Sequence, residues 1–569
     1  MRKILSFIII FAACFFAIRA LLVPGFFTMH DDEQIARLYD LNNSLLAGQM
    51  PPRWVSHLGF GYGYPLFNFY PPFVYYAGEL FYLLGFSLIN ATKIVMVLGF
   101  LLSALFMYLW VKNRYGAFAG IVSAVLYTYG PYHGVDLYVR GAFAEFFSFV
   151  WIPAIFWSLD LAVKKRSYGW GMLSGIFLAF LVLTHNLTAL AFIPFYIAYL
   201  SLISFENKQY IKQLIPIVII SGITALGFSA YFWLPALLEK KYTLVDNILT
   251  KELASYKIHF LYPQQLWSSP WGYGGSIVGP DDGLSLQVGK VHILVAIFSL
   301  VGILILLIRR KKIMVPFVIF CLFLFSVCMT VTYSQPIWDA LPPLWYIQFP
   351  WRFLVFSVAF ASFLGGFFIA FLQKYLPRNI VYGIGIILSC IAIVLIAKYF
   401  HPQKYLPVTD SFYTTNHDIE WRVSDMSFEY APKGIKTILV NGTTHLPVFK
   451  NTIPQKTYEV LAKDMQVSII TNKPQDKEFT VKAQDDGLLV INTFSFPGWE
   501  TFVDGKRVSY SDNNRLKLIV LSIPKGNHTV KVLFRDTFVR TVGNILSGIT
   551  LIALFLYFLL SSQRFFKNK

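Results

Sequence analysis

Three consecutive carboxylates, Asp31, Asp32 and Glu33, follow the first hydrophobic run of the chain. A carboxylate placed beside a substrate hydroxyl can take its proton in a general-base step. A simpler interpretation is that Thr28 caps a surface helix, with Asp31 three residues on and the other two acids in its first turn. Three acids and His30 close to a bilayer surface carry a large desolvation cost, so we favour a functional role over capping.

Other polar residues are expected at the same depth, where further loops meet the outer ends of hydrophobic runs. The segments YGPYHGVDLYVRGAFAE, LTHNLT and IQFPWRF supply them: His133, Asp136, Arg140, Glu145, His185, Asn186 and Arg352. Singly, each has a simpler role, such as a satisfied buried histidine or an arginine that snorkels to the interface. Together they combine carboxylates, which can take a proton, with guanidinium groups, which can hold a phosphate bidentately. This combination suits a substrate that is both a lipid and a phosphate.

The composition indicates that helices in a membrane position these residues. Hydrophobic residues make up 56% of the chain, charged residues only 14%, and the mean hydropathy is +0.57, outside the range of soluble domains. Apolar runs long enough to cross a bilayer recur at 4–23, 93–111, 117–130, 143–163, 169–184, 187–205, 213–234, 291–308, 313–332, 352–373, 379–399 and 541–560. We therefore predict a polytopic α-helical membrane protein with about 12 transmembrane helices.

Basic residues predict the orientation of these helices. They fall between alternate runs, at Lys112, Arg114, Lys164, Lys165, Arg166, Lys208, Lys212, 309–312, Lys374, Arg378, Arg564, Lys567 and Lys569. The positive-inside rule makes these loops and both termini cytoplasmic, provided that the stretch 72–89 with Glu79 lies along the outer surface. The first run is too long for a signal peptide and is expected to be a retained anchor. The protein is thus predicted in the cytoplasmic membrane, with its active face outside.

The region 401–540 differs in character from the rest of the chain. Charge rises, turn signals recur, and an Asp-Gly pair at 504–505 separates two strand-like runs, as in a hairpin. We predict a β-rich, sandwich-like extracytoplasmic domain. The predicted organisation is a transmembrane domain at 1–400 with a catalytic first loop at 24–92, the β-rich domain at 401–540, and a final transmembrane helix and cytoplasmic tail at 541–569.

Several classes of protein do not fit the sequence. The net charge of +18 is spread over topogenic loops, so we expect contact with anionic lipid and no nucleic-acid partner. The four cysteines all lie in apolar runs, which excludes a disulfide framework or a cysteine-based metal site in the exposed domain. The chain also lacks the P-loop, the dinucleotide fingerprint, His-Glu-x-x-His and Gly-x-Ser-x-Gly. Any chemistry therefore belongs to the membrane part.

The first third of the chain resembles a known superfamily. An acidic pair in the first loop, followed by an aromatic-rich Pro-Pro helix, is similar to the GT-C glycosyltransferases that use polyprenyl-phosphate sugars. The segments HDDEQIARL, GFGYGYPLFNFYPPFVYY, GPYHGVDLYVRGAFAE and LTHNLTAL resemble bacterial membrane proteins related by name to pyruvoyl-tetrahydropterin synthase. FPGWETFVDGKRV and IPKGNHTVKVLF resemble the C-terminal exposed domain of YfhO-like proteins.

The superfamily resemblance implies that an acid of the first loop is the catalytic base. Asp32 and Glu33 match the acidic pair as it is usually spaced, whereas His30 and Asp31 match the closer relatives. The choice between the two aspartates stays open at this point. A divalent metal is possible but not required, since arginine can stabilise a leaving group with one phosphate; the same three acids would hold the metal.

One departure from the relatives concerns the donor phosphate. Several relatives carry Lys before the Pro-Pro pair, where this chain has Tyr70. The phosphate-binding role is then expected to fall on Arg140 and Arg352, with Arg53 third, because a phosphate leaving group needs a fixed cation. His57, on the same loop as Arg53, completes the predicted substrate-binding residues. The aromatic segment 59–70 either stacks on sugar rings or lies in the membrane interface.

The resemblance implies an inverting glycosyltransferase with a polyprenyl-phosphate-linked sugar as donor and an extracytoplasmic glycan, lipid or protein as acceptor. Two other functions remain open. A transporter or flippase of lipid-linked sugars also needs about 12 helices, although it would place charges at mid-membrane and show repeated halves. A non-catalytic cell-envelope scaffold built on the β-rich domain is the third alternative.

Overall fold

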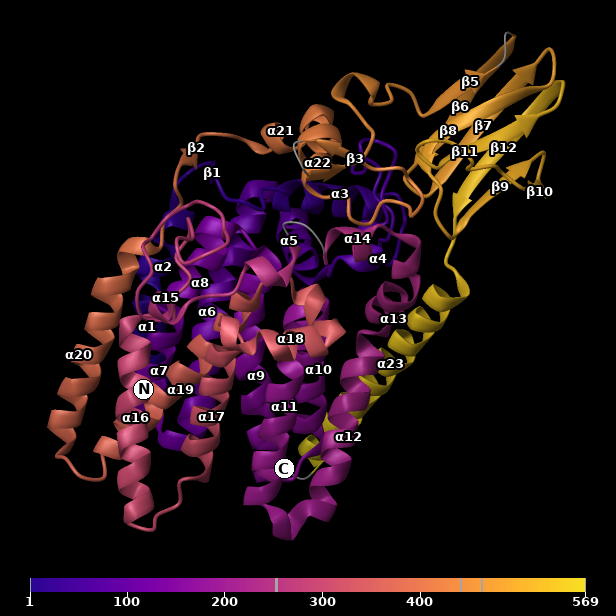
Figure 1. Ribbon diagram of the computed structural model, residues 1–569. Coiled ribbons are helices and arrows are strands. Elements are labelled where there is room, and N and C mark those ends of the chain that lie inside the picture. The colour runs from indigo at the N-terminus through magenta and orange to yellow at the C-terminus, as the bar shows by residue number, and fades with distance from the viewer. Residues whose placement is uncertain (1, 251–253, 441–442, 462–463, 568–569) are drawn as a thin grey trace.

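The computed structural model describes residues 2–250, 254–440, 443–461 and 464–567, so Lys569 of the predicted basic tail lies outside the described residues. Helices form a bundle, and the long connections gather at one of its ends (Figure 1). The C-terminal sheets project from that same end, while the C-terminus lies near the other (Figure 1). The site-bearing loops and the β-rich domain are therefore on one side of the bundle.

Within the described residues, eight helices are long and apolar enough to cross a membrane. They are α6 (Leu88–Tyr115), α9 (Phe143–Lys165), α11 (Asn186–Glu206), α12 (Ile211–Phe228), α16 (Lys290–Ile308), α19 (Leu354–Leu372), α20 (Arg378–Ile396) and α23 (Phe538–Lys567). The apolar windows of α9 and α19 are 89% buried, which places both helices in the centre of the bundle, whereas that of α23 is 11% buried and faces outward. The prediction of a multi-pass helical membrane protein is confirmed.

The remaining predicted runs also form helices. A bent pair, α1 (Arg2–Ala13) with α2 (Phe15–Ile18) and η1 (Arg19–Leu22), turns by 41° and makes a ninth span if counted as one. Three shorter apolar helices are α7 (Ala117–Thr128), α10 (Tyr168–Thr184) and α17 (Met314–Cys328). The run 213–234 is divided at Ser229, whose hydroxyl donates back to the Ala225 carbonyl, and continues as α13 (Ala230–Glu239). The total of 12 membrane-crossing helices stays a prediction.

Local sequence explains where these helices begin and end. The Ser87 hydroxyl accepts a hydrogen bond from the Asn90 backbone at the start of α6, and the helix stops at Gly116, whose φ is +92°. The stretch 72–89 forms α5 (Phe73–Leu83), only 11 residues long, and Glu79 lies buried in it with Asn42 donating at 2.7 Å. A helix of this length is shorter than a span, in agreement with the expected surface helix.

The first loop and the segment after α20 are folded together. The loop contains β1 (Phe26–Phe27), α3 (Gln34–Leu46) and α4 (Leu66–Phe69), and β1 pairs with β2 (Tyr405–Leu406). The segment continues through α21 (Asp410–Tyr413), the π-helical η11 (Asp418–Val423), α22 (Ser424–Met426), β3 (Ile438–Val440) and β4 (Thr443–His445) over the top of α3 (Figure 1). The carboxylate of Asp410 accepts hydrogen bonds from the Leu88 and Ile89 backbone, which fastens the segment to α6.

The β-rich domain consists of two open antiparallel sheets. One has the order β10-β9-β12-β7-β6 and the other β11-β8-β5. The strands are β5 (Tyr458–Leu461), β6 (Met465–Lys473), β7 (Asp476–Ala483), β8 (Gly487–Phe494), β9 (Trp499–Val503), β10 (Lys506–Val508), β11 (Leu518–Ile523) and β12 (Gly526–Phe534). Phe479 and Tyr458 from different sheets meet edge to face at 5.8 Å, and the predicted Asp504-Gly505 hairpin joins β9 to β10. The predicted β-rich domain is confirmed, but its sheets start at 458, well after the change in composition at 401.

The predicted orientation leads to a labelling result. In a chain whose native cysteines are replaced by serine, Lys450→Cys should react with an impermeant thiol reagent on intact cells, whereas Arg310→Cys should react only after permeabilisation. Lys450 begins η12 (Lys450–Thr452), between β4 and the sheets of the β-rich domain, and Arg310 follows α16. Reaction of both positions from outside would contradict the orientation derived from the basic loops.

Candidate active site

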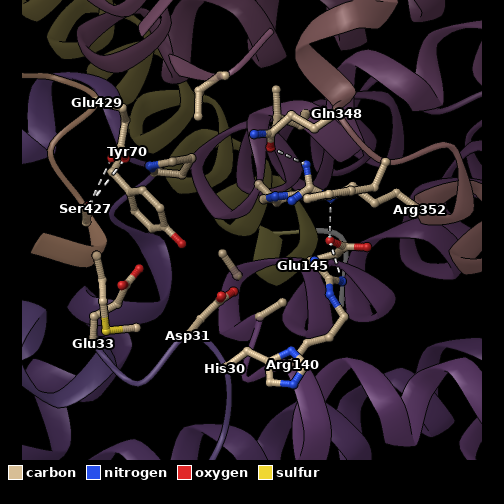
Figure 2. A pocket seen from close by; sticks show the side chains of 18 of the residues that line it. His30, Asp31, Glu33, Tyr70, Arg140, Glu145, Gln348, Arg352, Ser427 and Glu429 are labelled. Carbon is tan, nitrogen blue, oxygen red and sulfur yellow. Dashed lines mark hydrogen bonds and ion pairs between the residues drawn. The ribbon is translucent and has the colours of Figure 1, made fainter. Parts of the chain in front are cut away.

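A cavity of about 490 Å³ lies at the end of the bundle that carries the loops (Figure 2). Its walls come from the first loop, the start of α9, the α10–α11 turn, the connection at 248–284, the η9 turn (Pro350–Phe353) and residues 426–430. Nine of the residues predicted from sequence line it: His30, Asp31, Glu33, Tyr70, Arg140, Glu145, His185, Asn186 and Arg352. Elements far apart in sequence thus bring most of the predicted polar residues to one place.

The acids do not cap a helix through their side chains. Helix α3 begins at Gln34, with Glu33 at the N-cap position and no side-chain capping bond. The Thr28 hydroxyl instead donates to the Lys404 carbonyl at 3.4 Å. The capping interpretation with Thr28 as N-cap is therefore wrong, because the helix starts later and both the backbone N–H and the hydroxyl of Thr28 donate to the Lys404 carbonyl.

Asp31 is held by its backbone and leaves its carboxylate to the cavity. Its N–H donates to the Arg140 carbonyl at 2.8 Å, and that of His30 donates to Val139 at 3.0 Å. The backbone at 30–31 therefore lies close to that at 139–140. Residue 141 must be a glycine for this contact, because its φ is +66° and a Cβ there would collide with the Met29 side chain. Across the part of the chain that the structure describes, no hydrogen bond or ion pair engages the Asp31 carboxylate, which points into the cavity (Figure 2).

Asp32 points away from the cavity. Its carboxylate lies 3.3 Å from Arg422, which also pairs with Asp418 at 2.5 Å. Burial raises the pKa of Asp32 to about 7, an effect that Arg422 opposes and Asp418 reinforces. The sequence left Asp31 and Asp32 equivalent; the structure places only Asp31 on the cavity wall.

Glu33 lines the cavity together with a residue that we did not predict, Arg37. Their side chains pair at 2.6 Å, one helical turn apart. The Arg37 guanidinium is buried, lies 4.0 Å from the Tyr70 ring centre and donates to the Ser427 hydroxyl at 2.9 Å. Tyr70, which stands where several relatives have lysine, thus packs its ring against the guanidinium group of Arg37 from α3.

Burial raises the pKa of Glu33 to about 7, although Arg37 opposes the rise; Asp31 and Glu429 add to it. Protonation of Glu33 therefore stabilises the folded protein. This contribution is fully present below the ordinary pKa of 4.5 and is lost as the pH rises through about 7.

We accordingly expect Glu33→Gln to flatten the fall in thermal stability between about pH 4.5 and pH 7. Unfolding of purified protein, followed across this pH range, measures the effect. Asp485→Asn serves as the control, because the Asp485 side chain is 86% exposed. Parallel curves for the parent and Glu33→Gln would contradict the raised pKa.

Two arginines share one carboxylate on the opposite wall. Glu145 accepts from Arg140 at 2.9 Å, lies 3.0 Å from the Arg352 Nε, and accepts from the Tyr132 hydroxyl at 2.6 Å. Arg140 also pairs with Asp136 and lies 4.5 Å from the Trp351 ring centre. These contacts hold both guanidinium planes in place.

Both guanidinium groups keep donors that the described chain does not use. Every hydrogen bond of Arg140 comes from Nη1, and Arg352 uses Nη1 toward Ile347 and Gln348. Among the described residues, nothing accepts from Nε or Nη2 of Arg140 or from Nη2 of Arg352. Gln348, which accepts from Arg352, has a φ of +65°. Such a strained backbone conformation is found most often at functional sites. The pair can therefore receive an anion with several oxygens.

His185 and Asn186 occupy the tight turn predicted between α10 and α11. The Nδ1 of His185 accepts from the Thr188 backbone at 3.3 Å and lies 2.6 Å from the Thr188 hydroxyl. Because a backbone N–H only donates, a neutral His185 carries its proton on Nε2. The ring thus adds a donor to the wall that carries the arginines.

Four further predicted residues do not line the cavity, because each is used elsewhere. Arg53 donates to Asn68 and Asn544 and pairs with Asp536, which joins the first loop to α23. His57 pairs with buried Asp40 at 2.5 Å.

His133 is fully buried and stacks on Phe149 with ring centres 4.1 Å apart. Asp136 lies behind Arg140 in the π-helical η2 (Asp136–Arg140) and acts on the cavity only through that arginine. Polar residues near the loop end of a helix look alike in sequence, but these four serve packing and ion pairs.

The cavity also has polar residues that sequence analysis missed: Arg37, His259, Gln348, Ser427 and Glu429. For Arg37 the signal was present, since an acid and an arginine four residues apart predict a pair on one helix face. For Ser427 and Glu429 no local signal existed, because they reach the cavity only when the segment after α20 folds over α3. Burial raises the pKa of Glu429 as well, an effect that Arg37 opposes.

The metal site considered from sequence is not assembled. Among the residues that the structure describes, no three His, Cys, Asp or Glu side chains are grouped to hold a metal ion. Asp31 faces the cavity, Asp32 pairs with Arg422, and Glu33 pairs with Arg37. The three acids diverge, so they do not offer a common set of oxygens.

Fold and site together define a multi-pass membrane protein with a charged cavity at one end of its bundle and a β-rich domain beside it. The chain belongs to the family described as "6-pyruvoyl-tetrahydropterin synthase related domain; membrane protein", whose family model matches residues 67–402. The matched region begins after the acids of the first loop and ends before the sheets of the β-rich domain. It contains the cavity wall formed by Arg140, Glu145 and Arg352, the arginine wall. An uncharacterized protein of Lactococcus lactis subsp. cremoris (strain MG1363) is 24% identical over 228 residues, which span 38% of this chain and 37% of that relative.

Proposed function

We propose that the protein is a membrane glycosyltransferase that moves a sugar from a polyprenyl-phosphate donor to an acceptor hydroxyl, with inversion at the anomeric carbon. The observation that carries the proposal is one cavity that contains the Asp31 carboxylate, which has no partner among the described residues, together with the guanidinium groups of Arg140 and Arg352, which keep N–H donors that those residues do not use. A base and a fixed cation site are the two groups that such a transfer needs.

The proposed reaction uses Asp31 as the base. Its carboxylate takes the proton of the acceptor hydroxyl while that oxygen forms a bond to the anomeric carbon. The bond from the anomeric carbon to the phosphate oxygen breaks, and its electrons leave with the polyprenyl phosphate. Arg140 and Arg352 hold the phosphate through their remaining N–H donors and stabilise the charge that develops on it.

Glu33, Arg37 and Tyr70 have a supporting place in this mechanism. Arg37 is fixed by its pair with Glu33 and by the Tyr70 ring, so the three form a rigid wall next to Asp31. We assign them to the orientation of the acceptor. The charged residues of the cavity come from loops and helix starts at one end of the bundle, whereas a transporter is expected to carry its charges near the middle of its spans; this favours a transferase.

The test is transfer by the purified full-length chain in nanodiscs, with a panel of radiolabelled polyprenyl-phosphate sugars and cell-envelope glycan as acceptor. The expected result is loss of label from the lipid and its appearance in glycan, with inverted anomeric configuration by mass spectrometry and NMR. Movement of intact sugar lipid between leaflets without transfer would identify a flippase instead. Neither transfer nor movement with any donor would overturn the proposal.

A further inference from the structure

A second cavity, of about 420 Å³, lies between the bundle and the β-rich domain. One side is formed by η4 (Lys240–Tyr242), which follows α13, and by residues 432–433. The other side comes from loops of the β-rich domain at 495–497 and 510–517. Nothing in the proposed glycosyl transfer uses this cavity.

Its charged lining is strongly basic. Three lysines, Lys241, Lys433 and Lys517, line the cavity with one acid, Asp512, which gives these four groups a net charge of +2. Asp512 pairs with Lys517 at 3.3 Å. In the described ranges of the chain, the ammonium groups of Lys241 and Lys433 have no hydrogen bond or ion pair; that of Lys241 lies 5.1 Å from the centre of the Tyr242 ring.

Hydroxyl groups and aromatic rings complete the lining. The Ser495 and Tyr510 hydroxyls are 3.1 Å apart, and the Tyr242 and Phe496 rings meet edge to face at 6.4 Å. Hydroxyl donors beside these ammonium groups are suited to an oxyanion, and the rings give the rest of a ligand an apolar surface.

We propose that this second cavity binds a phosphate ester. A net charge of +2 matches a phosphate group, and lysine acts as a point charge that tolerates different phosphate orientations. The inference is independent of the proposed glycosyl transfer, because no residue is shared between the two cavities.

Two sources supply this chemistry, a phospholipid headgroup and a soluble phosphate ester. Leu237 and Leu238, on the last turn of α13 shortly before Lys241, are 58% and 47% exposed. Apolar side chains followed by Lys and Tyr are typical of the membrane boundary, so a headgroup lies within reach.

The two cavities are lined by neighbouring parts of one segment. Met426, Ser427, Glu429 and Tyr430 line the first and Pro432 and Lys433 line the second, so a bound phosphate would fix the segment that carries Ser427 and Glu429. The second cavity therefore connects the position of the β-rich domain with the wall of the candidate active site.

The test compares the full chain with Lys241→Gln/Lys433→Gln and with the charge-matched control Lys436→Gln/Lys450→Gln, whose lysines are exposed and outside the lining. The probes are glycerol 3-phosphate, followed by thermophoresis, and phosphatidylglycerol in nanodiscs, followed by native mass spectrometry. We expect at least one probe to bind the parent and the control equally, and the first variant about tenfold more weakly. Thermal unfolding establishes that both variants are folded.

The pattern across the probes identifies the source. Binding of phosphatidylglycerol alone indicates a lipid headgroup, and binding of glycerol 3-phosphate alone indicates a soluble ester. The proposal is overturned if the parent binds neither probe, or if both double variants bind as the parent does.

Discussion

Replacing Asp31 by asparagine is expected to leave a folded, membrane-inserted protein that transfers sugar at least about a hundredfold more slowly than the parent. The Asp31 N–H, which donates to Arg140, is unchanged by the substitution, and the carboxylate has no partner among the described residues whose loss would cost stability. The amide has the same shape but no basic oxygen of useful pKa. General-base contributions run from about a hundredfold to ten-thousandfold in rate.

Asp32→Asn is the matched control, because the neighbouring carboxylate pairs with Arg422 outside the cavity. We expect it to change the rate severalfold at most. Initial rates of transfer in nanodiscs, with the amount of inserted protein measured in the same samples, compare the two variants. Parental rates for Asp31→Asn, or a larger loss for Asp32→Asn, would remove Asp31 from the role of base.

Some helices and strands of this fold can be predicted from sequence more easily than others. Each apolar run is a helix, because a stretch without charges in lipid has no other way to satisfy its backbone. The strands β9 and β10 around Asp504-Gly505 follow from turn chemistry. The break between α12 and α13 at Ser229 cannot be predicted from sequence, since the residues on both sides of it are equally apolar.

The assembly of the cavity is less predictable than the elements. The first loop, the α10–α11 turn and η9 are expected to meet because they share one end of the bundle. The contribution of residues 426–430 depends on contacts between segments far apart in the chain, such as that of Arg37 with Ser427, 390 residues away, for which neither periodicity nor spacing gives a sign. The choice between Asp31 and Asp32 also required Arg422, a residue of that same segment.

Phosphate binding gives the second large effect that we expect. Arg352→Ala should weaken binding of a polyprenyl-phosphate sugar by about ten- to a hundredfold, which corresponds to the loss of one or two charged hydrogen bonds. Arg352 is the cleaner position, because Glu145 keeps its pairs with Arg140 and Tyr132 when Arg352 is removed. Arg140→Ala would in addition leave Asp136 buried without its partner.

Donor affinity is measured in an Asp31→Asn background, where slow turnover lets binding be observed at equilibrium. Arg352→Lys should recover only part of the affinity, because an ammonium group restores the charge but not the fixed fork of donors. A purely structural role would instead lower the melting temperature and leave the affinity of the folded fraction unchanged. Equal donor affinity in the Arg352→Ala and parental backgrounds would place the phosphate elsewhere. If Asp31→Asn nevertheless abolished transfer, Asp31 would keep its role as the base, and the phosphate would have to bind to cations other than Arg140 and Arg352.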